Sequence, residues 1–156
     1  MDVFQLDLST LVTVTAPAIT RRVVDRLADE GFAGVKASHG YVVQRLLAHE
    51  PTTSALARSL GMSQQGASKQ VADLISLGYA ERVPVADDQR AQTVRLTERG
   101  RAMVAATRRI RADLERQVIA KSDAQDVAAA KRALAALVDV LDLSGRVAER
   151  SVPDPG

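Results

Sequence analysis

The chain has 156 residues, of which 46% are hydrophobic and 26% charged, with a net charge of +2, so it is long enough for one globular domain and only mildly basic. A polyanionic partner would therefore have to be bound by a local basic patch rather than by overall charge. The absence of Cys excludes disulfides and thiolate metal sites, and with no apolar run of about 20 residues and acids in the N-terminal MDVFQLDLST, we expect a cytoplasmic protein with no membrane partner.

Residues 1–35 predict an N-terminal helical unit. The segment LSTLVTVTAPA is rich in β-branched residues, so a frayed start, a strand and the first half of a helix kinked at Pro17 all fit it. We favour the kinked helix, because Val23, Val24 and Leu27 follow with helical spacing before glycines interrupt the pattern.

Two shorter helices are predicted next. Ser38 is a plausible N-cap for a helix that stops before Pro51. Thr52 or Thr53 can then cap the short helix SALARSL, and Gly61 ends it as a left-handed residue would.

The helix that begins after Ser63 has one apolar face and an unusual polar face. Its apolar face consists of Ala67, Val71, Leu74 and Ile75. The opposite face consists of Gln65, Lys69, Ala72 and Ser76, flanked by Gln64 and Ser68. A helix face that only meets solvent usually carries Glu and Lys at i,i+4 spacing. Gln and Ser instead read base edges, and Lys binds guanine or phosphate, so the pattern favours a DNA-reading helix.

Gly66 lies in the first turn of this helix and has two interpretations. It either avoids a clash with the preceding helix or lets the backbone approach DNA closely, and on its own it favours neither. Its position in the chain favours DNA, because two helices joined by a short turn at Gly61 are typical of a helix-turn-helix.

After Gly78 the pattern changes to alternation with a period of two. YAERVPV and QTVRL predict two strands joined by the turn ADDQRA, with Pro84 marking an edge strand. A hairpin directly after a helix-turn-helix is typical of a wing, in which we expect Asp88 to orient Arg90 or Arg82. Thr97 then predicts the N-cap of a new helix.

This order of helix, turn, helix, LGYAER, a hairpin with DDQR at its tip, and VRLTERG resembles the winged helix-turn-helix of the multiple antibiotic resistance regulator (MarR) family. The resemblance runs from about residue 36 to residue 103 and includes Asp88, Arg90, Leu96, Thr97 and Gly100. It implies a mostly α fold with a small β-wing, in which residues 36–100 form a DNA-binding lobe. It also implies dimerisation through N- and C-terminal helices. Helix pattern and resemblance together give these candidate residues for contacting double-stranded DNA: Thr53, Ser54, Ser63, Gln64, Gln65, Gly66, Ser68, Lys69, Arg82, Asp88 and Arg90.

Residues 101–145 predict two long amphipathic helices, the second opened by a capping box of Ser122 and Gln125. Their apolar surface exceeds what the small lobe can cover, so we favour a homodimer over a monomer in which the two helices cover the lobe. Residues 146–156 are expected to be a flexible tail. The candidate dimerisation residues are Ile110, Leu114, Val118, Leu134, Leu137, Val138 and Leu141.

The sequence contains no residue pattern typical of an active site, a metal site or a cofactor site, so we expect none of these. His39 and His49 are ten residues apart and share no helical face, so capping or surface roles are expected for both. By resemblance to the family, a small aromatic effector would bind near Ala37, Tyr41, Arg45 and Met103. The alternative function is a winged-helix module that binds another protein, but only 3% of residues are aromatic, which is few for a protein-binding face.

Overall fold

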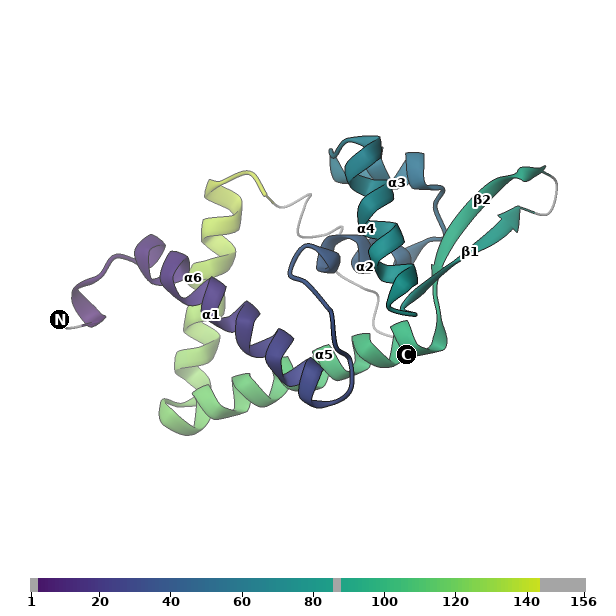
Figure 1. The fold of residues 1–156 in the computed structure, drawn as a ribbon. Helices are drawn as coiled ribbons and strands as arrows, with labels where there is room; N and C mark the ends of the chain where they lie inside the picture. Colours follow the sequence, from purple (N-terminus) through teal and green to yellow (C-terminus); the bar gives the residue numbers. More distant parts are fainter. Residues whose placement is uncertain (1–2, 86–87, 144–156) are drawn as a thin grey trace.

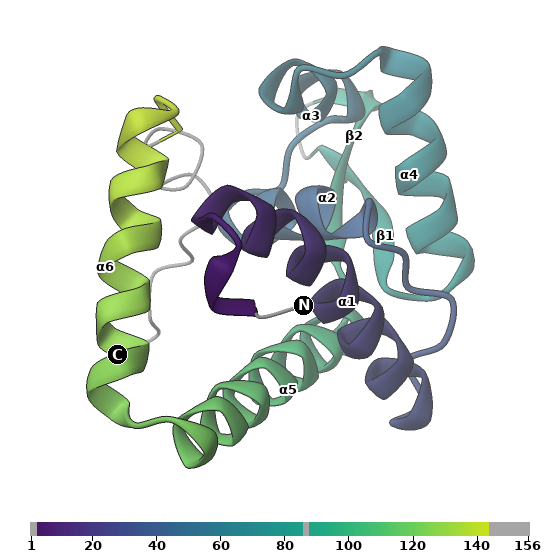
Figure 2. The same cartoon turned by 90° about the vertical axis from the view of Figure 1, so that its left-hand side faces the viewer.

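The computed structural model describes residues 3–85 and 88–143. Figure 1 shows a winged lobe at one end of the molecule and α6 at the other, joined by the rod of α5, and Figure 2 shows the same separation from the side. The fold is therefore mostly α with a small β-wing, as predicted. The elements are a 3₁₀ turn Val3–Gln5, α1 Leu8–Asp29, α2 His39–Ala48, α3 Thr53–Leu60, α4 Gln64–Ser76, β1 Ala80–Val85, β2 Asp88–Leu96, α5 Glu98–Lys121 and α6 Ala124–Val140.

Helix α1 continues through Pro17 as one element of 22 residues, so the preference for a helix over a strand is confirmed. Asp7 caps its start by accepting a hydrogen bond from the Thr10 amide, and the bonds from Ser9 and Thr10 hold the pKa of Asp7 well below its usual range. The helix tolerates its threonines because their hydroxyls donate back to carbonyls four residues earlier, as Thr13 does to Ser9.

The start of α2 corrects the expected cap. The helix begins after Ser38 as predicted, but the Ser38 side chain makes no capping bond and instead donates to Gln70 Oε1 at 3.3 Å. The imidazole of His39 accepts a hydrogen bond from the Lys36 amide through Nδ1 at 3.2 Å. His39 is fully buried, so its expected surface role is wrong and only a capping role is supported.

The predicted caps of α3, α4 and α5 are confirmed. Thr52 accepts from the Ala55 amide, Ser63 from the Gly66 amide and Thr97 from the Gly100 amide. Gly61 ends α3 with φ +62°, in the left-handed region that glycine adopts at little cost. Helices α3 and α4 thus form the helix-turn-helix that the sequence predicts.

The wing is an antiparallel hairpin in which Ala80 pairs with Leu96 and Pro84 with Gln92. Its turn is shorter than expected, because β2 begins at Asp88, which pairs with Val85 across a bulge. Residues 88–91 of the predicted turn therefore belong to the strand. Pro84 lies next to the bulge, one of the positions in a sheet where proline is tolerated.

One hydrophobic core joins the lobe to the two long helices around it. It is built from residues of α1, α2, α3, α4, the wing and α5. Ile110 is 6% exposed in this core, so its assignment to a dimer surface is wrong: within a single chain it already packs inside. Helix α5 begins at Glu98, so the expected boundary between residues 100 and 101 falls inside a helix. The largest fully buried side chains are Tyr79, Leu27, Leu56, Leu74, Leu96, His39, Val42, Val71 and Val94.

The junction of α5 and α6 differs from the predicted capping box. Ser122 ends α5, where its hydroxyl donates to the Val118 carbonyl. The N-cap of α6 is Asp123, which accepts from the Asp126 amide at 2.7 Å. Both residues suit an N-cap, and the one nearer the helix takes the position. The predicted flexible tail of residues 146–156 lies outside the described residues.

Candidate nucleic-acid interface

The outward face of α4 is the centre of the candidate interface. Ala67, Val71 and Leu74 are fully buried, and this burial fixes which way the helix faces. The predicted opposite face, made of Gln65, Lys69, Ala72 and Ser76, is exposed throughout. Beside it, Ser63 and Gln64 are exposed and Ser68 is half-buried. The candidate reading residues therefore lie on one continuous surface of the helix.

The first turn of α4 is coupled to α3. The side-chain amide of Gln64 donates through Nε2 to Ser54 Oγ at 3.1 Å, so Ser54 holds the end of this Gln in place. Gln64 and Ser54, both among the candidate DNA contacts, thus lie side by side although they belong to different helices. Arg58, one turn after Ser54, is also exposed on α3. Arg58 is not among the residues predicted from the sequence. Its i,i+4 spacing from Ser54 is the feature of the sequence that could have placed it on the same helix face.

Thr53 is set apart from the other candidates. It is only 8% exposed, and within the described residues its hydroxyl has no hydrogen-bond partner. The side chain faces the lobe interior, so its assignment to the DNA-contacting side chains is wrong. Its neighbour Thr52 caps the helix by accepting from the Ala55 amide.

The wing is held against the start of α3. The Val94 amide donates to the Pro51 carbonyl at 2.9 Å, and Thr52 forms an isolated antiparallel β-bridge with Thr93. On β1, Arg82 is exposed. Arg95 on β2 pairs with Glu81 at 2.8 Å, and this pair raises the Arg95 pKa. Asp88 and Arg90 lie in β2, but their side chains, and any bond between them, are outside the described part of the structure.

Gly66 is neither fully buried nor packed against a neighbouring backbone. A Cβ atom placed there would come 3.1 Å from Ser63 Oγ and 3.7 Å from the Met62 methyl, both of them side chains. The first contact is tight, but it belongs to the cap of the same helix. Avoidance of a clash with the backbone of α3 is therefore not what calls for glycine here.

A second side of α4 carries polar contacts that were not predicted from the sequence. Lys36 pairs with Asp73 at 2.6 Å, and Ser38 donates to Gln70. Lys36 lowers the Asp73 pKa through this bond. The buried His39 ring lies with Nε2 3.8 Å from Asp73, and burial is the main cause that lowers the His39 pKa. Gln70 and Asp73 are three residues apart on the flank of α4, and this spacing is the sequence feature that could have indicated a shared polar side of the helix.

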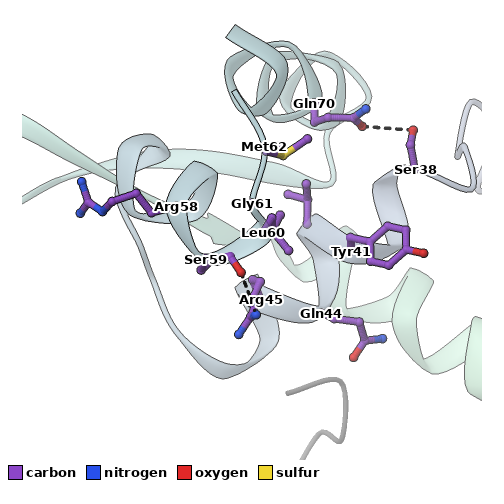
Figure 3. A pocket seen from close by; sticks show the side chains of 11 residues that line it. Ser38, Tyr41, Gln44, Arg45, Arg58, Ser59, Leu60, Gly61, Met62 and Gln70 are labelled. Carbon is purple, nitrogen blue, oxygen red and sulfur yellow. Dashed lines mark hydrogen bonds between the residues drawn. The ribbon is translucent and has the colours of Figure 1, made fainter. Parts of the chain in front are cut away.

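Two hollows flank α2, and the predicted effector residues are divided between them. The α2–α3 hollow, with a volume of about 650 Å³, includes Tyr41 and Arg45, and Figure 3 shows Arg45 directed toward the Ser59 carbonyl. The α1–α5 hollow, with a volume of about 550 Å³, includes Ala37 and Met103. Tyr41, 53% exposed, borders both. The structure therefore brings Ala37, Tyr41 and Met103 together at the α1–α5 hollow and leaves Arg45 in the other hollow.

The terminal helices leave apolar side chains uncovered. Helix α6 has no buried residue, and Leu134 and Leu141 are 40% and 56% exposed. Val118 near the end of α5 is 47% exposed, whereas Leu114, Leu137 and Val138 are half-buried. Figure 2 shows α6 standing away from the lobe, so it does not cover the lobe as the monomer alternative requires.

The described residues offer neither a metal site nor a membrane span. Among residues 3–85 and 88–143, no three His, Cys, Asp or Glu side chains gather in a way that could hold a metal ion. No helix in the same part of the chain has the length and apolar character that crossing a membrane requires.

Comparison with known proteins identifies the fold. The reduced form of MarR from E. coli is 21% identical with a TM-score of 0.67, and the match covers 85% of this chain and 97% of that chain. MepR, a transcription regulator of the Staphylococcus aureus multidrug efflux pump MepA, is 19% identical with a TM-score of 0.68, covering 87% and 99%. A MepR mutant from S. aureus bound to an oligodeoxyribonucleotide is 18% identical with a TM-score of 0.63, covering 88% and 99%.

At the level of sequence, no curated protein matches the chain significantly. Residues 33–91, which include α2, α3, α4 and β1, match the model of the MarR family. The winged-helix lobe of this chain is therefore similar to the MarR family over residues 33–91, and its fold is that of the MarR-type structures.

Proposed function

We propose that this protein is a transcriptional regulator that binds a specific DNA sequence as a homodimer. The observation that carries the proposal is the outward face of α4, which is exposed and uncharged except for Lys69, while Ala67, Val71 and Leu74 on the opposite face are fully buried. Side chains of this kind, held on a rigid helix next to a wing, suit the major groove. The match of residues 33–91 to the model of the MarR family supports the same function. We propose no enzymatic activity.

Selection of bound sequences from a random DNA pool tests this function. We expect enrichment of one sequence, and weaker binding of a scrambled duplex of the same composition at the same salt concentration. Equal affinity for selected and scrambled duplexes at all salt concentrations would contradict specific recognition. It would favour the alternative of a lobe that binds another protein.

The homodimer is supported by the uncovered apolar side chains of the terminal helices. The large exposed hydrophobic residues include Leu8, Val14 and Ile19 of α1 together with Val118, Leu134, Val140 and Leu141. A second copy of the chain would cover such a surface under two-fold symmetry. The two α4 helices would then meet successive major grooves, so a footprint should show an inverted repeat with half-site centres about 10 bp apart.

Control by a small aromatic effector is the last part of the proposal, and the α1–α5 hollow supports it. Its floor is apolar, with Val23, Leu27 and Met103, and Arg108 and Arg111 also line it. An aromatic molecule with an acidic group would suit these walls. Titration of the DNA complex with salicylate and with the neutral benzyl alcohol, followed by fluorescence anisotropy, tests this: the acid is expected to release DNA at lower concentration.

A further inference from the structure

Two neighbouring glutamines begin α4, and the structure restrains only one of them. Gln64 donates through Nε2 to Ser54 Oγ on α3 at 3.1 Å. Gln65 is exposed, and its side chain makes no hydrogen bond to any residue in the described ranges 3–85 and 88–143. The two side chains have the same chemistry, so the contact with α3 is what distinguishes them.

We propose that Ser54 is a positioning residue that holds the side-chain amide of Gln64 in one orientation, in which it reads an adenine. The inference rests on the proposed function, because α4 carries the proposed reading face. It goes further by assigning part of the sequence preference to a residue of the preceding helix and by naming the base that this residue selects.

The contact lies where a DNA-reading helix meets base edges. Gln64 is the first residue of α4, and the N-terminal residues of such a helix are the ones that contact bases. Ser54 lies in the first turn of α3. Both side chains are exposed, so the amide of Gln64 is ordered at the surface of the lobe and not in its core.

The chemistry of the held amide matches adenine. A glutamine amide has two N–H donors and one carbonyl acceptor, and the bond to Ser54 uses one donor. The second N–H and the carbonyl oxygen remain, and adenine presents the acceptor N7 and a donor on N6 to this pair in the major groove. Guanine presents two acceptors, N7 and O6, so the carbonyl oxygen of Gln64 would face an acceptor there.

Restraint before binding sharpens this preference. Glutamine is among the side chains that lose most rotamer freedom when they are ordered. The bond to Ser54 orders Gln64 in the free protein, so less freedom is lost when DNA binds. Without the bond, the amide can turn its N–H donors toward guanine. We therefore expect a sharper choice of base at the position that Gln64 reads than at the position that Gln65 reads.

The test is made on the full-length protein with the selected duplex. Gln64→Ala and Gln65→Ala first identify the base pair whose preference each side chain sets. Affinity is then measured for duplexes with adenine or guanine at each of these positions, using the wild type, Ser54→Ala, and Ser54→Thr, which keeps the hydroxyl. Ser59→Ala is the matched control, because Ser59 is an exposed serine of the same helix whose hydroxyl donates to the Leu56 carbonyl at 3.0 Å.

The informative quantity is the ratio of the affinities for adenine and guanine, since a contact with phosphate would change both affinities equally. We expect Ser54→Ala to lower this ratio at the Gln64 position about two- to tenfold, the range of one hydrogen bond, and to leave it unchanged at the Gln65 position. Ser54→Thr and Ser59→Ala should keep the wild-type ratio at both.

A second readout needs no DNA. The NMR order parameter of the Gln64 side-chain amide in the free protein should exceed that of Gln65. It should fall to the Gln65 value in Ser54→Ala and stay high in Ser54→Thr.

The proposal is overturned if Ser54→Ala weakens binding to both duplexes equally, which would make Ser54 a phosphate contact alone. It is also overturned if the ratio rises in Ser54→Ala, if Gln64→Ala changes no preference for adenine, or if the two amides are equally mobile in the free wild type. Failure of the proposed function is a separate result, because no sequence would then be enriched from the random pool. An enriched sequence with an unchanged ratio overturns only the role of Ser54.

Discussion

At the residue scale, the candidate interface separates side chains that read bases from those that position the protein. Gln65 and Lys69 are exposed on α4, so each is expected to contact base edges. Arg90 lies in β2 close to the turn of the wing, where an Arg can enter a narrow minor groove and contact shape and backbone. Substitutions on α4 should therefore change the sequence preference, whereas a substitution of Arg90 should change affinity for all sequences.

Gln65→Ala or Lys69→Ala should cost about 1 to 3 kcal/mol on the selected duplex and relax the preference at one base position per half-site. Arg90→Ala should weaken binding to selected and scrambled duplexes alike, and lower the slope of log K against log salt by about 0.9 for each phosphate that Arg90 neutralises. Anisotropy titrations of both duplexes across a salt series measure this. A selective loss for Arg90→Ala with uniform losses for the α4 variants would show that the roles are reversed.

Gly66→Leu should lower DNA affinity with little change in stability. Replacing a helical glycine gains about 1 kcal/mol, and crowding of the Ser63 cap offsets a similar amount. The larger side chain would separate the helix from the groove, whereas Gly66→Ala should retain most of the affinity. Thermal unfolding and DNA titration of both variants test this. Full affinity in Gly66→Leu would mean that this position does not face the groove.

The buried His39 predicts a loss of stability on acidification. Burial lowers its pKa below the ordinary 6.5, with Lys36 opposing protonation and Asp73 partly favouring it. The unfolded state then binds more protons, so stability is complete above about pH 6.5 and falls as the pH is lowered through that value. Between pH 7.5 and 5.5 the loss is at most about 1.4 kcal/mol. Urea unfolding of the wild type and His39→Leu measures it, and an equal pH slope in both would contradict this origin.

At the scale of elements, the junction between α4, the wing and α5 depends on a close approach at Gly100. The Tyr79 carbonyl accepts from the Thr97 amide at 3.1 Å, and a Cβ on Gly100 would lie 2.0 Å from that oxygen. The Thr97 hydroxyl also donates to the Gly78 carbonyl at 2.6 Å. The start of α5 is therefore seated on the backbone that leads into the wing, and only glycine fits between them.

Gly100→Ala should destabilise the protein by about 1 to 3 kcal/mol, because the contacted atom is backbone and cannot move aside cheaply. Gly40→Ala is the matched control: its surroundings are open, and the substitution should stabilise α2 by about 0.5 to 1 kcal/mol. Urea unfolding of both variants measures the difference. Similar stabilities for the two would show that α5 can shift away from Tyr79.

At the scale of the whole molecule, the separation of α6 from the lobe determines which apolar surface a second copy of the chain would cover. Helix α6 buries none of its residues within one chain, whereas α5 buries five, among them Met103 and Ile110. The dimer surface is therefore expected on α1, α6 and the end of α5 rather than along the whole of α5. A charge placed on this surface would be buried without a partner in the dimer.

Leu134→Asp should shift the protein toward monomer and weaken DNA binding, because a monomer can engage only one half-site. Ala136→Asp is the matched control, since it adds the same charge on the opposite side of α6, where the helix is also exposed. Sedimentation velocity at micromolar concentration, together with titration of the selected duplex, measures both effects. A dimer of unchanged stability in Leu134→Asp would place the interface elsewhere.

The sequence by itself determined the elements whose signals are local. The caps at Ser63 and Thr97 follow from bonds within three residues, and the left-handed Gly61 follows from the freedom of glycine at a helix end. The sequence narrows the cap of α3 to Thr52 or Thr53, of which Thr52 takes the position. The α4 faces follow from helical periodicity. Where two residues could serve one local role, as Ser122 and Asp123 could for α6, the sequence left the choice open and the predicted capping box was wrong.

Only the tertiary structure decided contacts between residues distant in sequence. Ile110 and Leu134 look alike in an apolar stripe, yet Ile110 packs in the core because α1 crosses α5 at that level, while Leu134 remains exposed. Asp73 and Lys36 are 37 residues apart, and no local pattern predicts their pairing. Periodicity specifies which side of a helix is apolar, but what covers that side depends on where the other helices cross it, and crossing is set by the packing of the whole chain.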